Sequence, residues 1–571
     1  MSGDIGMLSS TFTSGLRQRH ARLAALRRRT TAKILGSAFF RSQTATGRSE
    51  SLAISPGHLG VTDPRVRVDL AADRVDFDGE SIMLDGLGLF DVAMPSDRFA
   101  RFAAGFAWLD TLRAQNTEQA IAAMQGWTAD WLAGRHRLAS DARDITVVIR
   151  RLKALLNHAD TLLADADAET YDALILQIVD DLHDGAARWR SAPDGPERVI
   201  ALITVLLGAL AVAEDEEQIA KFEALLIAEL GSEFGRNGGP QSRCATDTVD
   251  VLANLIPLVR THHHLGREVP PQLLEIQAQM NGYLRTLRLG DMSLARFNGV
   301  GATETDTLFR ILKLDAARAP HVADVVNGYV RLEGGPVVVI ADVATAPPLP
   351  RSAKAHAGAF SFEMSDGSDA VFLNCGHAQP MAAGITSGSR TTSCHNALEL
   401  GSSSSASFLE REVSDPAAEP FLAGPAGLKA QVVVTEEAQG FTGQHDGYAR
   451  LFGLRHTRSV SVQGDGTLVS GRDTLKAPSG DMRFAADVPF AVRFHVAPDV
   501  DVRTTGNANE IRLLLPGGAD WVFNAGDTVQ AFVEETVHVG SGGRSVPGLQ
   551  IALRGACHGE ADVAWSLKRA P

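Results

Sequence analysis

Apolar residues recur with a helical period from about residue 97 to about residue 320. In "DITVVIRRLKALLNHAD", Ile145, Val148 and Leu152 fall on one helical face, and Arg150 lies largely opposite them. Similar runs cover residues 99–112, 118–132, 170–182, 197–212, 218–230, 246–265 and 271–287. Helices that follow one another at this spacing predict a bundle, a solenoid or a toroid.

The pattern changes near residue 325 to short runs that alternate as β-strands do. Examples are "GGPVVVIADV", "GAFSFEMSDG" and "EIRLLLPGG", which are separated by Asp-Gly, Gly-Gly and Pro-Gly turns. Such runs predict a large antiparallel β-sandwich. We therefore predict a multidomain protein, α then β, with a basic N-terminal segment at 1–50, a helical domain at 51–325 and a β-sandwich at 326–571.

The chain has 571 residues and a formal net charge of −14, which argues against nucleic acid as a partner. An acidic glycan is not excluded, because a local basic cleft can lie on an acidic protein. The most apolar run, at 199–213, is shorter than the roughly 20 residues that span a bilayer, so no transmembrane segment is predicted. The arginine-rich N-terminus lacks the apolar centre of a secretory signal, which predicts a cytoplasmic protein. Two interpretations of it stay open, a basic amphipathic helix on anionic lipid and an ordinary surface helix.

Four cysteines, Cys244, Cys375, Cys394 and Cys557, form no CxxC pair. No zinc ribbon or disulfide framework is therefore predicted. The pattern leaves open a local disulfide between Cys375 and Cys394 or free buried thiols.

Four segments combine glycine turns with residues that can bind or transfer protons. They are "RNGGPQSRCATDTVDVL" at 236–252, "RLGDMSLARFNGVG" at 288–301, "RSAKAHAGAFSFEMSDG" at 351–367 and "TTSCHNALELGSSSS" at 391–405. Histidine, arginine and asparagine in such loops are candidates for acid–base chemistry and for binding carboxylates.

Together these segments resemble the heparinase II/III-like family of bacterial polysaccharide lyases, and most strongly its alphaproteobacterial branch. The branch motif DGGHxSRNP is similar to residues 236–244 here, and its loop GDGxLALFNGG is similar to residues 290–299. The family strings AHAxxLSFE, LIVNCG and SHSTL read "AHAGAFSFE", "VFLNCG" and "CHNAL" in this chain. Downstream, "HDGYARLFGLRHTR" at 445–458 also matches.

The resemblance implies an (α/α) toroid at 51–325 joined to the β-sandwich, with a cleft between them. Family members cleave uronic-acid glycans such as heparan sulfate or alginate by β-elimination. That reaction needs a group that neutralises the uronate carboxylate, a base for the C5 proton and an acid for the leaving oxygen. The resemblance thus implies a carbon–oxygen lyase with an acidic polysaccharide as partner and no required cofactor. It also implies a periplasmic or cell-envelope location, and a homodimer is left open.

The resemblance implies four catalytic candidates, His356, His395, Tyr283 and Tyr448. Lys354 stands where related lyases often have a second histidine. For the two histidines, the alternative is a pair of hydrogen-bonded core side chains. For Tyr448 the alternative is a sandwich tyrosine that hydrogen-bonds to backbone.

Candidate substrate-binding residues are Asn237, Arg243, Arg296 and Asn298. Arginine can bind a carboxylate or sulfate in bidentate fashion. The alternative is that these side chains tie the loops together.

A structural zinc site is also implied, at His356, His395 and Asn374. Zinc-binding members have aspartate where Asn374 stands, so the set lacks its anionic ligand. Pro240 also replaces the histidine of the DGGH motif. These departures support a second hypothesis, a carbohydrate-binding or cell-envelope protein that retains the lyase fold with reduced catalysis.

Overall fold

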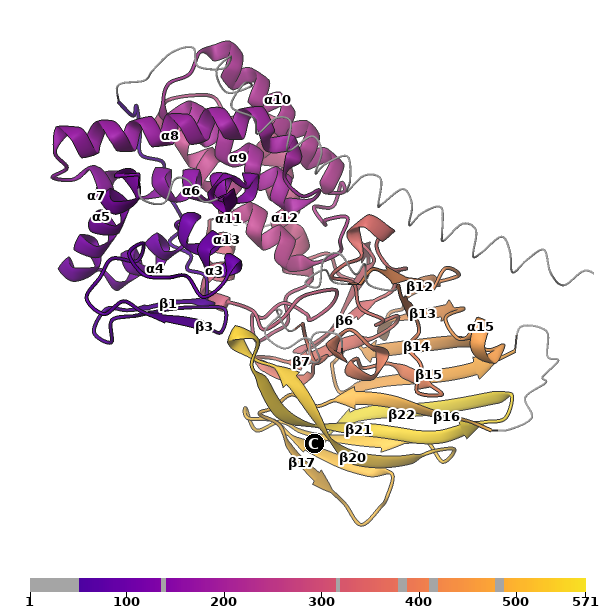
Figure 1. Ribbon diagram of the computed structural model, residues 1–571. Coiled ribbons are helices and arrows are strands. Elements are labelled where there is room, and N and C mark those ends of the chain that lie inside the picture. The colour runs from indigo at the N-terminus through magenta and orange to yellow at the C-terminus, as the bar shows by residue number, and fades with distance from the viewer. Residues whose placement is uncertain are drawn as a thin grey trace, which may run out of the picture. The chain divides into compact units, whose positions relative to one another are not determined.

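The computed structural model describes residues 51–134, 140–314, 319–377, 388–409, 420–477 and 487–570. The chain divides into two compact units. One contains the residues up to Glu233 together with Asp250–Gln277, and the other contains Phe234–Val249 together with Ala278–Pro571. Helices dominate the first unit and sheets dominate the second (Figure 1). The domain boundaries predicted from sequence stay predictions, and the basic segment 1–50 lies outside the described residues.

The first unit begins with a small antiparallel sheet and continues as helices. Helix starts follow local signals: Thr117 and Asp167 accept hydrogen bonds from backbone N–H groups in the first turns of α5 and α8, and Pro196 opens α9. The elements are β1 (Val66–Asp69), β2 (Arg74–Phe77), β3 (Glu80–Met83), α3 (Asp97–Ala104), α4 (Trp108–Gln115), α5 (Glu118–Leu132), α6 (Ile145–Asn157), α7 (Ala159–Leu163), α8 (Ala168–Arg188), α9 (Pro196–Ala211), α10 (Glu216–Glu233) and most of α11 (Ala245–His264).

Helix α9 contains most of the apolar run at 199–213, and nearly all of the residues that it contributes to this run are buried. Within the described ranges, no helix is both long and apolar enough to cross a membrane.

The second unit is built on antiparallel sheets. An eight-stranded sheet runs β12-β13-β14-β15-β22-β19-β18-β17, a five-stranded sheet runs β4-β5-β6-β7-β8, and a four-stranded sheet runs β20-β21-β16-β9. Helix α12 (Pro271–Thr286) joins the two units along the chain, and α13 (Thr305–Lys313) precedes the first of these strands. The strands are β4 (Val325–Val326), β5 (Tyr329–Gly334), β6 (Val337–Asp342), β7 (Phe362–Asp366), β8 (Asp369–Phe372), β9 (Leu398–Leu400), β10 (Ser407–Phe408), β11 (Leu422–Ala423), β12 (Lys429–Val434), β13 (Ala438–His445), β14 (Arg455–Gln463), β15 (Leu468–Lys476), β16 (Val488–His495), β17 (Asp501–Thr504), β18 (Glu510–Leu514), β19 (Asp520–Ala525), β20 (Gln530–Val539), β21 (Ser545–Cys557) and β22 (Glu560–Arg569).

An aromatic core joins the three large sheets. The ring of Phe362 on β7 stacks on Trp565 of β22 at 5.6 Å, and Phe494 on β16 meets the same indole at 4.9 Å. Gly471 on β15 faces Trp565 so closely that a Cβ atom there would lie 2.1 Å from the indole. The predicted fold class, helices followed by an antiparallel sandwich, is confirmed.

A buried ion pair fixes the loops of this core. Arg458 on β14 binds Asp473 on β15 through Nε at 2.7 Å, and neither side chain is exposed. The Nη1 group of Arg458 also donates to the carbonyl oxygens of Phe360 and Asn396. The fully buried guanidinium therefore anchors the two segments that carry His356 and His395.

Candidate functional site

Three buried histidines from different segments of the second unit form a hydrogen-bonded row. His356 lies between the short helix η3 (Leu349–Arg351) and β7, and His395 follows η4 (Thr392–Cys394). The Nδ1 atom of His356 lies 3.0 Å from Nε2 of His395. On its other side, Nε2 of His356 lies 3.4 Å from Nδ1 of His377. His356 and His395 were predicted from the sequence, and the structure adds His377.

The positions of the protons in this row follow from its ends. Nδ1 of His395 lies 2.7 Å from the carbonyl oxygen of Thr391, which can only accept, so this nitrogen carries a hydrogen. Nε2 of a neutral His395 then accepts from Nδ1 of His356. Nε2 of His356 in turn accepts from the backbone N–H of Gly299 at 3.2 Å and from Nδ1 of His377. Every donor therefore points from His377 towards Thr391, and the unprotonated Nε2 of His377 has no partner among the described residues.

Burial keeps the row neutral. It lowers the pKa of His356 well below the usual histidine value, and the neighbouring His395 and His377 lower it further. Burial lowers the pKa of His377 to about 4, with Lys354 and Arg390 adding to the shift, and it lowers that of His395 to about 4. At neutral pH His377 thus offers a lone pair, which is the form that a proton acceptor requires.

The loop with Asn298 and Gly299 positions His356. Asn298 takes a positive φ of 45°, and its Oδ1 accepts the backbone N–H of His356 at 3.0 Å. Its Nδ2 donates to the hydroxyl of Tyr329 at 2.7 Å and to Asp342 at 3.1 Å. Asn298 has no exposed polar group to offer a ligand, since it is 2% exposed.

Arg243 is likewise committed to the protein. Its guanidinium pairs with Asp342 at 2.6 Å, donates to three carbonyl oxygens and lies over the ring of Tyr329. The hydroxyl of Tyr329 donates back to the carbonyl oxygen of Arg243 at 2.6 Å. These contacts match the alternative in which Arg243 and Asn298 tie the loops together. Asp342 and Tyr329 escaped the sequence analysis because neither stands in a motif.

The two tyrosine candidates are both fully buried and lie apart from the histidine row in their hydrogen bonding. Tyr448 donates from its hydroxyl to the carbonyl oxygen of Leu398 at 2.6 Å. Burial raises the pKa of Tyr448, and it raises that of Tyr283 well above the usual tyrosine value. The geometry of Tyr448 favours the backbone-bonding alternative. A general acid needs contact with the leaving oxygen, and neither hydroxyl has the exposure for it.

Lys354, at the position of the second family histidine, forms an ion pair. Its Nζ lies 2.7 Å from Oδ1 of Asp247, a side chain that is only 3% exposed. The Lys354 side chain itself is 41% exposed. Asn237 and Arg296 are half-buried, and Arg296 reaches the carbonyl oxygen of Val539 at 3.5 Å. These two residues stay predictions as substrate contacts.

The implied zinc ligands do not fit a metal ion. Nδ1 of His356 and Nε2 of His395 lie 3.0 Å apart, and the third implied ligand, Asn374, is a neutral amide that brings no anionic ligand. The Oδ1 atom of Asn374 accepts the backbone N–H of Asn396 at 2.9 Å. Across the described ranges, no cluster of three or more histidine, cysteine or acidic side chains is arranged to hold a metal. We derive no step through zinc.

His377 is the member of the row that sequence reasoning missed. A signal for it was present, because it lies three residues after Asn374 in "NCGH". Its place beside His356 depends on the backbone, where its N–H donates to the carbonyl oxygen of Val300 at 3.0 Å. That contact joins segments about 80 residues apart in sequence and could not be read from the motif.

One family model matches the part of the chain that carries the histidine row. Residues 318–566 match the family described as "Heparinase II/III-like, C-terminal". The match covers most of the strands of the second unit. The heparinase-like domain thus includes the three histidines and the Arg458–Asp473 pair.

Similarity extends over most of the chain at low identity. "FtsZ-localized protein C" of Caulobacter vibrioides is 26% identical over 555 residues, which cover 94% of this chain and 93% of the relative. It fits the alphaproteobacterial branch indicated by the motifs. Among solved structures, "Heparinase III" aligns with a TM-score of 0.64 at 12% identity, covering 86% of this chain and 81% of that one. Heparan sulfate lyase HepC from Pedobacter heparinus aligns with a TM-score of 0.58 at 12% identity, covering 94% and 88%. These structures establish a lyase-like fold.

Proposed function

We propose that this chain is a division-associated scaffold that retains a polysaccharide-lyase fold, localises with FtsZ and does not cleave glycans. The observation that carries the proposal is the similarity to FtsZ-localized protein C over 94% of this chain and 93% of the relative. A match along both whole chains argues that the protein shares the relative's architecture as well as a common fold.

The state of the site supports this proposal. β-Elimination needs an acid within reach of the leaving oxygen and a cationic or polar group for the uronate. The two tyrosine candidates are buried, and Arg243 is saturated by Asp342 and carbonyl oxygens. Lys354 replaces the second histidine and pairs with Asp247.

Co-sedimentation with FtsZ polymers tests the proposal. Purified chain is mixed with FtsZ from the same cell, with GTP to assemble polymers or with GDP to prevent assembly. We expect the chain in the pellet with GTP and in the supernatant with GDP, and a fluorescent fusion at the division site. A chain that stays in the supernatant with GTP, together with a diffuse fusion, would overturn the proposal.

A lyase acting on a uronic-acid glycan is the second candidate, and the open end of the histidine row favours it. Neutral His377 has an unprotonated Nε2 that can accept a proton, and its pKa of about 4 makes it a weak base at neutral pH. The substrate would be an acidic polysaccharide, as for the heparan sulfate lyase that shares the fold.

Ultraviolet absorbance separates the two candidates. A lyase creates a conjugated C4–C5 double bond, which absorbs strongly, on at least one of a panel of uronate glycans. His377→Ala would then abolish the signal, whereas His558→Ala would leave it unchanged, because His558 is exposed and pairs with Asp487 at the surface. The scaffold proposal expects no absorbance change on any glycan.

A further inference from the structure

Two of the four cysteines lie side by side next to the histidine row. The backbone N–H of Cys375 donates to the carbonyl oxygen of Cys394 at 3.0 Å, and the two thiols are hydrogen-bonded to each other. Both are free thiols; Cys375 is buried and Cys394 is half-buried. Cys375 follows β8 and Cys394 ends η4, so eighteen residues of chain lie between these two neighbouring cysteines.

A histidine holds Cys375 in place. Nε2 of His495 lies 3.0 Å from the carbonyl oxygen of Ser393, so this nitrogen carries the hydrogen and Nδ1 accepts. The thiol of Cys375 lies 3.6 Å from that Nδ1, and the hydroxyl of Thr536 lies 2.9 Å from it. Cys375 is therefore oriented by a fixed acceptor on one side and by Cys394 on the other.

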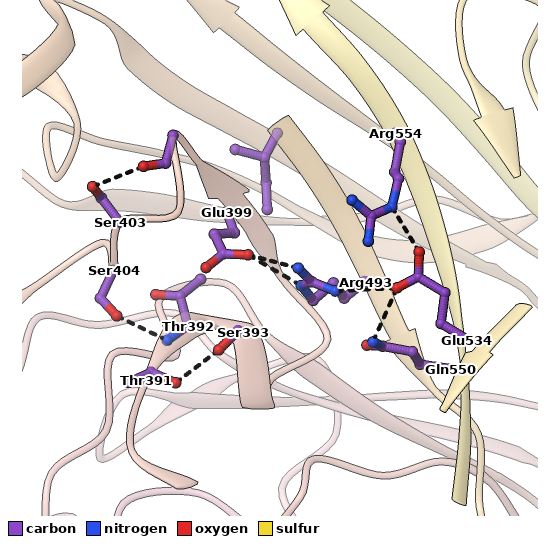
Figure 2. Close-up of polar contacts among 12 residues, drawn as sticks. Thr391, Thr392, Ser393, Glu399, Ser403, Ser404, Arg493, Glu534, Gln550 and Arg554 are labelled. Carbon is purple, nitrogen blue, oxygen red and sulfur yellow. Dashed lines mark hydrogen bonds and ion pairs between the residues drawn. The ribbon is translucent and has the colours of Figure 1, made fainter. Parts of the chain in front are cut away.

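The surroundings of Cys394 suit a reactive sulfur. The hydroxyls of Thr391 and Ser393 lie near it, and Arg493 lies close enough to act on it electrostatically. Figure 2 shows Arg493 between Glu399 and Glu534, with Thr391 and Ser393 bonded to each other beside this row of charges. A nearby guanidinium and partial exposure are features of cysteines that react with oxidants.

We propose that Cys394 and Cys375 form an oxidation site at which a hydroperoxide converts the thiol pair to a disulfide. The sulfur of Cys394 attacks the peroxide and breaks its O–O bond, giving a sulfenic acid at Cys394 and releasing the alcohol, or water from hydrogen peroxide. The sulfur of Cys375 then attacks the Cys394 sulfur, and the sulfenic oxygen leaves as water with the proton of Cys375. Two thiols and one hydroperoxide thus give one disulfide, one alcohol and one water, and the peroxide takes up both electrons.

The disulfide would link two of the segments that hold the histidine row. Cys375 lies two residues before His377, and Cys394 is adjacent to His395. Oxidation would therefore couple His377 and His395 covalently through the backbone. The site is independent of the proposed function, because it requires neither FtsZ nor a glycan.

Cys244 and Cys557 serve as comparators within the same chain. Both are buried, with 0% exposure. Burial raises the pKa of Cys244 to about 12, which makes its thiol inert at neutral pH. We expect these two thiols to stay reduced while the pair reacts.

Peroxide titration of the folded chain, followed by denaturation, alkylation and peptide mass mapping, tests the proposal. We expect loss of two of the four alkylatable thiols, a peptide containing Cys375 joined to Cys394, and full recovery with dithiothreitol. Loss of all four thiols together, or a cross-link to Cys244 or Cys557, would overturn it.

Two variants assign the roles. Cys375→Ser should accumulate a Cys394 sulfenic acid that a 1,3-diketone traps, and Cys394→Ser should show neither trapping nor cross-linking. Thermal melting confirms that each variant folds, and Cys557→Ser is the matched control, with unchanged cross-linking. Diketone labelling of Cys375 instead of Cys394 would contradict the assigned order, and no labelling in any folded variant would refute the site.

Discussion

The heparinase-like domain contains two buried histidine groups that differ in how they end. One is the row of His356, His377 and His395, and the other pairs His445 with His456. Each contains a contact of 3.0 Å between ring nitrogens of two histidines. In the second group, the backbone N–H of Gly447 donates to Nδ1 of His445, which fixes the direction of its donors towards His456.

The second group ends on a charged pair. Nε2 of His456 donates to Asp473 at 2.8 Å, and Arg458 binds the same carboxylate. Burial alone would raise the pKa of Asp473, but Arg458 and His456 hold it below its usual value. Every donor and acceptor of this group is satisfied within the protein. Within the part of the chain that the structure describes, the first group contacts no carboxylate and ends on Nε2 of His377, which has no partner there.

The histidines of the second group serve the structure, whereas the first group keeps a histidine available for acid–base chemistry. An anion and a guanidinium close the second group, so it contributes to the stability of the sandwich. The first group ends on a neutral histidine whose Nε2 lone pair has no partner among the described residues. Residue type and burial are the same in both, and the partners at the ends make the difference.

The largest loss of stability should come from removing the carboxylate on which the second group ends. Asp473→Ala leaves Arg458 buried without a counter-ion and removes the acceptor of the Trp565 indole N–H. We expect the free energy of unfolding to fall by about 3–5 kcal/mol. Denaturant unfolding measures it, with Asp562→Ala as control, because the Arg472–Asp562 pair is exposed and should contribute about 0–1 kcal/mol. Equal losses in the two variants would contradict this account.

Interrupting the open row at its centre should cost less. His356→Ala removes the acceptor of the Gly299 N–H and the donor to Nε2 of His395. We expect a loss of about 1–3 kcal/mol, the usual penalty for leaving buried polar groups unpaired. Denaturant unfolding of His558→Ala, at an exposed position, provides the baseline. A loss as large as that of Asp473→Ala would show that the row is not open.

The pH dependence of the free energy of unfolding should show that the histidines of the row are neutral in the folded protein. The pKa values of His377 and His395 are about 4 when folded and about 6.5 when unfolded, so the unfolded state binds more protons in this window. The free energy of unfolding should therefore fall as pH decreases from 6.5 to 4, by about 1.4 kcal/mol per pH unit for each histidine. In urea unfolding at several pH values, His377→Gln should give a shallower slope. An unchanged slope would remove His377 from the row.

The smallest effect should come from Tyr448, which packs against His445 in the closed group at a ring distance of 5.6 Å. Tyr448→Phe deletes the hydrogen bond to the Leu398 carbonyl oxygen. We expect a loss of about 0.5–1.5 kcal/mol in denaturant unfolding. Tyr171→Phe, at a half-buried position on α8, should change stability less. No loss for Tyr448→Phe would reopen the catalytic interpretation of this tyrosine.

Much of the candidate site could be located from sequence but not interpreted. The motifs placed His356 and His395 in the heparinase-like domain, and the structure brings them into contact. Arg243 and Asn298 were equally well placed by motif, yet they bind Asp342 and Tyr329 inside the protein. Asp342 lies about 100 residues from Arg243, and no local pattern indicates that these two residues meet.

The sequence by itself determined the order of helices and strands, because hydrophobic period and turn residues are local properties of the chain. The ordered motifs also indicated the family resemblance, which a family model matches over residues 318–566. Only the tertiary structure decided which histidine is open and which thiols meet. Those features depend on burial and on single hydrogen bonds from distant segments, such as Thr391 to His395 and Gly299 to His356, which fix where each proton lies.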